Sequence, residues 1–158
     1  MINKPDFNFS FQIIHWQKAH GRHGLPWQNT RDPYAIWLSE IMLQQTRVAT
    51  VIPYYQRFLQ CYPDIKSLSL ASLDEVLALW SGLGYYSRGR NLHKSAHLIV
   101  RNHGGKFPSE HNSIKQLPGI GRSTAAAIQV FAFGKRYAIL DGNVKRILTR
   151  YFGAKGYL

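Results

Sequence analysis

The segment 117–121, Leu-Pro-Gly-Ile-Gly, constrains how this chain of 158 residues can fold. Proline ends a preceding helix because its ring fixes φ and its nitrogen has no hydrogen to donate. Glycine allows positive φ and leaves neighbouring backbone N–H groups uncovered by side chains. An apolar run over 122–133 follows the segment. The pattern therefore predicts a short helix at about 113–116, a tight turn, and a longer helix.

A turn of this kind in front of a helix can bind a phosphate group. The first N–H groups of a helix have no intrahelical partner, and the positive end of the helix dipole lies there. A phosphate bound at that place is held without any readout of base sequence. We expect Gly119, Gly121 and Arg122 to form such a site in a helix-hairpin-helix motif at about 113–133. A plain connector between two helices is the alternative.

The charge of the chain favours an anionic partner. There are 20 Lys and Arg residues against 8 Asp and Glu, a formal net charge of +12. Such a surplus points to nucleic acid first and to an anionic membrane second. No apolar run approaches the length that spans a bilayer, and residues 1–17 lack the apolar core of a signal peptide. We therefore expect a protein of the bacterial cytoplasm, or of the nucleus or an organelle otherwise.

The pattern of apolar residues and helix caps predicts an all-α fold. Ser10, Asp32 and Ser72 are expected helix caps, and Asp32 is followed by a proline at the first helical position. Pro53 predicts a kink or a late start in its helix. No stretch alternates between apolar and polar residues for more than a few positions. The expected helices are 11–20, one opening at 33, 48–62, one after Ser72, 87–103, 113–116, 122–133 and 144–152.

Two carboxylates are the candidates for chemistry. Glu40 lies among apolar residues, where it is either a solvent-facing glutamate or a desolvated acid with a raised pKa that donates a proton. Asp141 precedes a predicted helix, where it is either an N-cap or an ionised group that stabilises a positively charged sugar transition state. Hydrolysis of a glycosidic bond uses two carboxylates of opposite protonation. The sequence leaves open whether the two side chains meet.

Five strings of residues together resemble one family. They are LPW at 25–27, WLSEIMLQQT at 37–46, LWSGLGYYSR at 79–88, LPGIGRSTA at 117–125 and ILDGNVKR at 139–146. With these strings in this order, nearly everything from Leu25 onward is similar to the adenine DNA glycosylases of the MutY type. This family belongs to the helix-hairpin-helix glycosylase superfamily and removes adenine mispaired with 8-oxoguanine or guanine. The resemblance implies the multi-helix glycosylase fold and double-stranded DNA with an adenine mismatch as the partner of a monomer.

The resemblance assigns roles to the two carboxylates and to the residues around them. Glu40 matches the acid that protonates adenine and later helps to position water, and Asp141 matches the carboxylate that faces the sugar. Relatives that also cut the strand carry a lysine at the position of Ser123, so Ser123 implies simple hydrolysis. The remaining matches are Arg22 and Trp27 in the base pocket with Ser123, and Gln45 and Tyr85 as residues that wedge into the duplex. From the residues themselves, we expect Arg88 to contact DNA as part of a basic face on the helix 87–103. We expect Lys145 to contact a phosphate, and trapping of an abasic sugar is the alternative role for its amine.

The resemblance also implies a division of the chain. Residues 1–30 would form an N-terminal helix and pocket loop, 31–134 the helical bundle with the hairpin, and 135–158 the start of a cluster-bearing part. Family members continue into a segment whose four cysteines hold a 4Fe-4S cluster and then into a domain that reads 8-oxoguanine. Cys61, the single cysteine, matches none of the cluster ligands. We therefore expect no cofactor or metal on this chain, which resembles a truncated catalytic part.

Two other functions remain open. The first is a glycosylase and lyase for oxidised pyrimidines from the same superfamily, against which Ser123 counts. The second is a DNA-binding module without catalytic activity, the truncated remnant of an enzyme.

Overall fold

The computed structural model describes residues 8–153, and every regular element within that range is a helix. The predicted all-α class is therefore confirmed. In chain order the elements are α1 (Phe9–His20), the 3-10 helix η1 (Pro26–Asn29), α2 (Pro33–Leu43), α3 (Val48–Cys61), α4 (Ile65–Leu70), α5 (Leu73–Trp80), α6 (Ser87–His103), α7 (His111–Lys115), α8 (Arg122–Phe133) and α9 (Gly142–Phe152).

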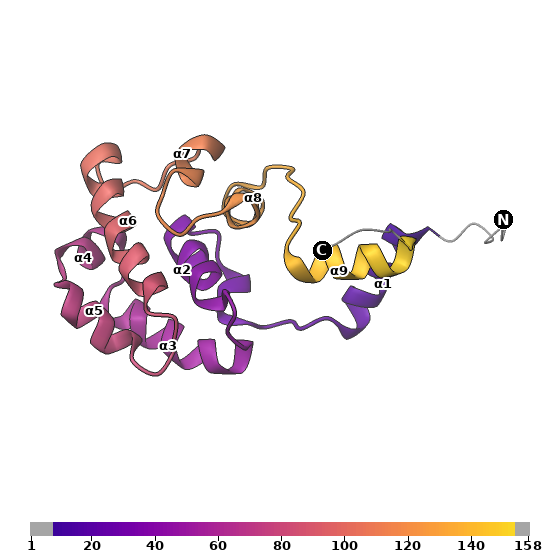
Figure 1. The fold of residues 1–158 in the computed structure, drawn as a ribbon, viewed down its shortest axis with the longest axis horizontal. Coiled ribbons are helices and arrows are strands. Elements are labelled where there is room, and N and C mark those ends of the chain that lie inside the picture. Colours follow the sequence, from indigo (N-terminus) through magenta and orange to yellow (C-terminus); the bar gives the residue numbers. More distant parts are fainter. Residues whose placement is uncertain (1–7, 154–158) are drawn as a thin grey trace.

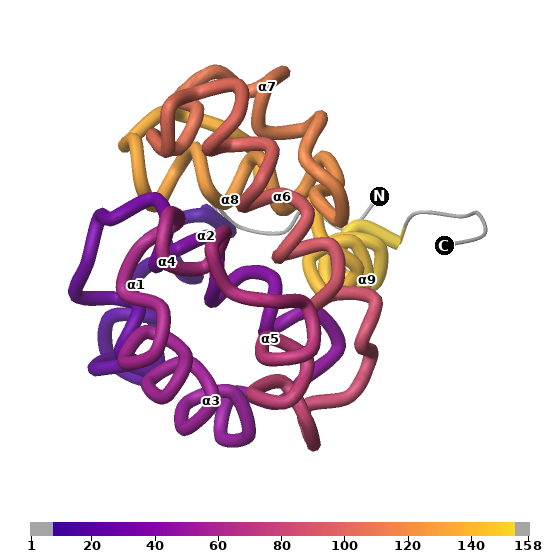
Figure 2. Tube along the Cα trace, turned by 90° about the vertical axis from the view of Figure 1, so that its left-hand side faces the viewer, coloured from indigo at the N-terminus to yellow at the C-terminus, as the bar shows by residue number. Residues whose placement is uncertain are grey.

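Helix α2 lies at the centre of the body and packs against α3, α6, α8 and η1. Figure 2 shows α7 and α8 at one end of the body and α3 and α5 at the other, with α2 and α6 between them. The start of α2 is fixed as predicted, because the Asp32 carboxylate accepts a hydrogen bond from the Tyr34 N–H at 3.1 Å and Pro33 occupies the first turn. Trp37 and Leu38 are completely buried. The side chains of α2 that are not fully buried, among them Glu40, therefore lie at the edge of the core.

Several helix ends follow the sequence signals. Helix α5 begins at the predicted capping box, in which Ser72 and Glu75 bond to each other's backbone N–H. Helix α6 covers the predicted range and ends at Gly104 with φ +60°, the left-handed conformation that suits a glycine. Helix α8 likewise ends at Gly134 with φ +65°.

Other helix ends differ from the prediction. The cap of α1 is Asn8 rather than Ser10, because the Asn8 side chain accepts from the Phe11 N–H at 3.0 Å. Helix α3 begins at Val48 and contains Pro53, so of the two predicted alternatives, a kink or a late start, the late start is excluded. Helices α7 and α9 each begin two residues earlier than predicted.

Helix α4 was missed, although a capping box marks it. The Asp64 carboxylate accepts from the Ser67 N–H at 2.7 Å, and the Ser67 hydroxyl accepts from the Asp64 N–H at 3.2 Å. An aspartate followed three positions later by a serine could therefore have indicated the start of this helix from the sequence.

Helices α1 and α9 lie apart from the body, each reached by an extended link (Figure 1). Neither helix contains a buried residue. They meet through aromatic rings, with the Phe9 centroid 4.3 Å from that of Tyr151. Phe11 and Trp16 on α1 and Ile147 on α9 are exposed. The segment that carries Asp141 is therefore held by fewer apolar contacts than the body.

No helix within residues 8–153 combines the length and the apolar character needed to cross a membrane.

We expect the backbone amides of α1 and α9 to exchange hydrogen much faster than those of α2, α3, α6 and α8. Local opening costs little free energy where few apolar contacts are lost. Peptide-resolved hydrogen–deuterium exchange measures the difference. If the amides of α9 were as protected from exchange as those of α2, the prediction would be wrong. Residues 135–153 would then be stabilised by something other than burial in the core.

Candidate functional site

An open cavity of about 670 Å³ lies between the segment before α2, helix α2 and helix α8. The segment from residue 23 to residue 31 forms one wall, α2 forms the floor and the end of α8 closes the far side. Ile36 near the start of α2 and Val130 near the end of α8 line the same cavity. At the opposite ends, the Gln44 side chain donates to the Thr124 hydroxyl at 3.4 Å. The two helices are therefore antiparallel, and the cavity lies at one end of the pair.

Glu40 lines this cavity from α2, one position beyond the continuously buried run 34–39. Burial, and to a smaller extent the negative charge of Asp141, raises the pKa of its carboxyl group to about 7. Removal of water disfavours the charged form of an acid, and a nearby anion does the same. The sequence left a solvent-facing glutamate and a desolvated acid open, and the structure has the desolvated acid.

Asp141 lies at the start of α9 and is exposed. Its Oδ1 accepts from the Val144 N–H at 2.7 Å, so the helix-cap interpretation of this residue is correct. A cap does not exclude a second role, because the hydrogen bond uses one carboxylate oxygen and fixes the orientation of the group. Its effect on the pKa of Glu40 shows that the two carboxylates lie within electrostatic range of each other.

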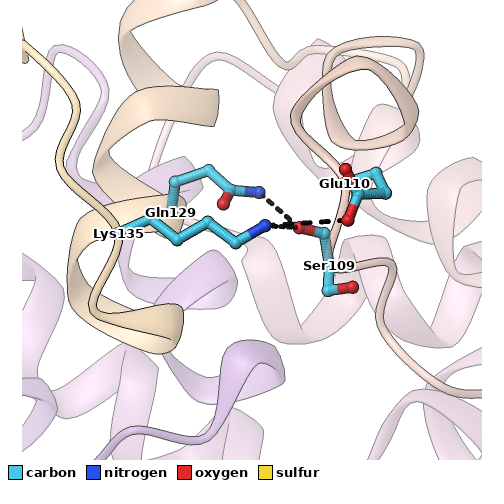
Figure 3. Close-up of polar contacts among 4 residues, drawn as sticks. All are labelled: Ser109, Glu110, Gln129 and Lys135. Atoms are coloured by element: carbon cyan, nitrogen blue, oxygen red, sulfur yellow. Dashed lines mark hydrogen bonds and ion pairs between the residues drawn. The ribbon is translucent and has the colours of Figure 1, made fainter.

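The link between α8 and Asp141 is anchored where it leaves α8. Gln129 Nε2 and Lys135 Nζ both donate to the Ser109 carbonyl oxygen at 2.9 Å, and Lys135 Nζ lies 3.7 Å from the Glu110 carboxylate (Figure 3). Two residues further along, the Tyr137 ring stacks on His111 at 4.7 Å. Gln129 is fully buried. These contacts tie the end of α8 and the first part of the link to the loop before α7 and to the first residue of α7.

Of the three residues predicted for the base pocket, only Trp27 lines the cavity. Its ring packs edge-on against Tyr55, with centroids 5.4 Å apart. Arg22 is exposed and its carbonyl accepts from Gln28 Nε2 at 2.9 Å, while Ser123 lies in the first turn of α8, at the other end of that helix. The structure therefore does not bring Arg22 and Ser123 to this cavity. Arg31 also lines the cavity, although the sequence analysis did not predict it. Its place in the polar turn before Pro33 was the signal that could have indicated it.

The hairpin before α8 has the predicted turn, with one difference. Gly119 has φ +79°, whereas Gly121 is the N-cap of α8 with φ −85°, which any residue can adopt. Of the two glycines, only Gly119 therefore uses the positive φ that glycine allows. Ile120 is buried and anchors the turn, and a Cβ on Gly121 would meet no atom within 4 Å. The N-terminus of α8 is thus left open, with no side chain capping it.

Gln45 and Tyr85 share a rare backbone conformation. Among the described residues they are the only non-glycine residues with positive φ, at 56° and 48°. Both are exposed, Tyr85 to 60%. Left-handed conformations cost free energy for such residues and persist only where the surroundings impose them. Two exposed, strained residues are candidates for a functional surface.

Arg88 is buried, so the expectation that it forms part of an exposed basic face is wrong. The residue is 7% exposed, and its guanidinium donates to backbone carbonyls at the end of α2 and in the turn before α6. By contrast Arg122 and Lys145 are exposed, the first at the hairpin and the second in α9.

The described residues offer no ligand set for a metal or a cluster. Within residues 8–153 no three His, Cys, Asp or Glu side chains come together as a metal site, and Cys61 is exposed on α3. A cluster held by four thiolates needs ligands that one cysteine cannot supply.

The fold and the hairpin define a helix-hairpin-helix protein with a carboxylate-lined cavity. Residues 38–157 match the family described as HhH-GPD superfamily base excision DNA repair protein. The chain belongs to this superfamily.

Two similar proteins carry the same name. The chain is 53% identical over 150 residues to the adenine DNA glycosylase of Buchnera aphidicola subsp. Acyrthosiphon pisum (strain APS), covering 95% of this chain and 43% of that protein. It is 46% identical over 151 residues to the adenine DNA glycosylase of Homo sapiens, covering 90% of this chain and 28% of that protein. The chain therefore spans less than half the length of these relatives.

Solved structures agree on the fold. A thermostable thymine-DNA glycosylase matches with a TM-score of 0.87 and 32% identity, covering 92% of this chain and 67% of that chain. An endonuclease III–DNA complex matches with a TM-score of 0.80 at 21% identity, covering 93% and 69%, which supports the fold alone.

We expect Glu40→Gln to stabilise the protein relative to the wild type at pH 8 and to lose that advantage at pH 4.5. The folded-state pKa of about 7 lies above the ordinary value of 4.5, so the protonated carboxyl stabilises the fold below pH 4.5, and this stability is lost as pH rises through about 7. The amide stays neutral, and the gain at pH 8 should be on the order of 2 kcal/mol. Urea unfolding at both pH values measures it. An identical difference at pH 4.5 and pH 8 would contradict the raised pKa.

Proposed function

We propose that this chain is the catalytic part of a base-excision enzyme that removes adenine mispaired with 8-oxoguanine or guanine in double-stranded DNA. The observation that carries the proposal is Glu40, a carboxyl with a pKa raised to about 7 inside a cavity of about 670 Å³. An acid whose pKa lies near the working pH can both give and regain a proton. The family membership and the named relatives support the same activity.

Glu40 acts as the general acid in this proposal. In its protonated form it donates a proton to a ring nitrogen of the adenine, and the bond between the base and the sugar breaks with its electron pair leaving on the base. A water molecule then adds to the sugar carbon and loses a proton, which returns to the Glu40 carboxylate. Adenine and an abasic sugar are the products, and Glu40 regains its proton.

Asp141 stabilises the sugar as positive charge develops on it. Its carboxylate is oriented by the bond to the Val144 N–H, and its charge reaches the Glu40 carboxyl. A negative group held at a helix N-terminus is favoured by the helix dipole. Glu40 and Asp141 thereby form the pair of unequal carboxylates that glycosidic hydrolysis uses.

DNA is bound through its phosphates and opened at the lesion. The net charge of +12 supports a polyanionic partner, and the open N-terminus of α8 with Gly119, Gly121 and Arg122 suits a phosphate. A base inside a stacked duplex cannot reach Glu40, so the adenine leaves the stack, and Gln45 and Tyr85 fill the space behind it. Lys145 on α9 is a further phosphate contact. The protein does this as a monomer.

A single assay separates this function from the two alternatives. The substrate is a labelled duplex with adenine opposite 8-oxoguanine, analysed with and without alkali. Product only after alkali supports hydrolysis, whereas strand breaks without alkali indicate a lyase, against which the serine at position 123 argues. Binding without any product indicates a module that has no catalytic activity.

We expect Glu40→Gln to lower the single-turnover excision rate by roughly 10²–10⁴-fold, because the amide cannot deliver a proton. DNA affinity should change little, since the amide keeps the size of the side chain. The wild-type rate should also fall as pH rises above about 7, where the acid form is lost. Asp74→Asn, a change on α5 outside the cavity, is the matched control and should leave the rate unchanged. Normal cutting by Glu40→Gln would require another proton donor.

We expect Gly121→Asp to weaken binding to any duplex by about tenfold or more, because like charges at about 4 Å repel by roughly 1–4 kcal/mol near a protein surface. The substitution fits the backbone and the open space at this position, and aspartate is a good helix cap, so the fold should not suffer. Fluorescence anisotropy over a salt series measures the affinity and its salt dependence. Gly121→Ala is the control and should bind nearly as the wild type. Unchanged binding by Gly121→Asp would remove the hairpin from the interface.

A further inference from the structure

The two strained residues, Gln45 and Tyr85, lie on separate loops. Gln45 follows the end of α2 and Tyr85 precedes the start of α6. Each has positive φ although neither is a glycine. Something in the surroundings must impose this conformation, because an isolated loop would relax to negative φ.

Arg88 supplies the contacts that these two loops share. From the first turn of α6, its Nη1 donates to the carbonyl oxygens of Met42 and Gln44, both at 2.7 Å, and its Nη2 donates to the Gly84 carbonyl at 3.1 Å. The further acceptors are the Ile41 and Leu83 carbonyls and the Thr46 hydroxyl, at 3.0, 3.3 and 3.0 Å. The acceptors therefore lie on both sides of Gln45 and immediately before Tyr85.

The shape of the guanidinium suits this task. It is planar and presents its donors in a fixed fork, whereas a lysine ammonium is a single point charge. The group lies 5.4 Å from the centroid of the Tyr85 ring and 5.5 Å from that of Trp80, so it also stacks beside one of the two strained residues. The carbonyl dipoles around it offset the cost of burying its charge.

The same loop is joined to the hairpin. Gln44, whose carbonyl accepts from Arg88, donates through its side-chain amide to the Gly119 carbonyl at 3.3 Å and to the Thr124 hydroxyl at 3.4 Å. Gln44 thereby connects Arg88 to the turn that precedes α8 through two successive hydrogen bonds.

We propose that Arg88 is a positioning residue that holds Gln45 and Tyr85 in their left-handed conformations, so that both side chains stand ready to enter the duplex together. The use of those side chains rests on the proposed function, whereas the conformational effect does not. Arg88 itself touches no DNA, since it is buried, and it acts only through the two loops.

The conformational part is tested by NMR on the 158-residue chain without DNA. A residue with positive φ has a short intraresidue distance between its amide and α hydrogens, which gives a strong NOE. The wild type should show this signal at Gln45 and Tyr85, and Arg88→Met should lose it at both. Arg88→Lys should lose the NOE signal at one or both of these residues, because one ammonium group cannot bond to both loops. Leu68→Ala, a cavity in the core on α4, lowers stability without touching the loops and should keep both signals. Persistence of both signals in Arg88→Met would overturn the proposal.

The functional part is tested with a duplex that carries 2-aminopurine in place of the adenine, opposite 8-oxoguanine. Fluorescence of this base rises when it leaves the stack. Arg88→Met should bind the duplex with wild-type affinity yet lose most of the fluorescence increase at saturating protein, as Gln45→Ala and Tyr85→Ala should also do, whereas Leu68→Ala should retain it. If the wild type gives no increase, the proposed function fails while the NMR result still decides the role of Arg88. Loss of the NOE signals with a full fluorescence increase would overturn the positioning role.

Discussion

The burial of α2 is the constraint on which the rest of the structure depends. Four other elements pack around this helix, and Trp37 and Leu38 are completely removed from solvent. Burial of such side chains contributes roughly 1.5–3 kcal/mol each for residues of this size. Because Glu40 stands directly beyond the buried run, the same packing removes water from its carboxyl group and raises its pKa to about 7. The chemistry proposed for Glu40 thus depends on the packing of the core.

The two ends of α2 serve different parts of the candidate site. Near the start of the helix, Ile36 faces the cavity together with the end of α8. At its other end, the last carbonyls of α2 accept from Arg88 and the Gln44 side chain reaches the hairpin. Carbonyls at a helix end lack intrahelical partners, and a buried guanidinium satisfies them at this end of α2. One antiparallel helix pair therefore connects the candidate acid, the strained loops and the turn that is proposed to bind phosphate.

The second carboxylate is placed by a different kind of interaction. Asp141 belongs to α9, which lies apart from the body and buries no residue. Polar contacts at Ser109 and the stacking of Tyr137 on His111 hold the beginning of the link that leads to it. Hydrogen bonds of this kind contribute about 0.5–1.5 kcal/mol each, much less than a packed core. Glu40 thus lies on a helix that is packed in the core, whereas Asp141 lies at the start of a helix that is held by fewer contacts.

Local signals in the sequence determined most of the helices and the candidate acid. The cap at Asp32, the capping box at Ser72, the glycine after α6 and the Pro-Gly turn act through neighbouring residues, so a sequence reveals them. The tertiary structure alone decided the environment of Arg88, which looks like one member of a basic face until α2 and the turn before α6 are placed around it. It also decided that Trp27 lines the cavity while Arg22 and Ser123 do not. The physical reason is that caps and turns depend on hydrogen bonds between residues a few positions apart, whereas burial and pKa depend on which distant segments exclude water.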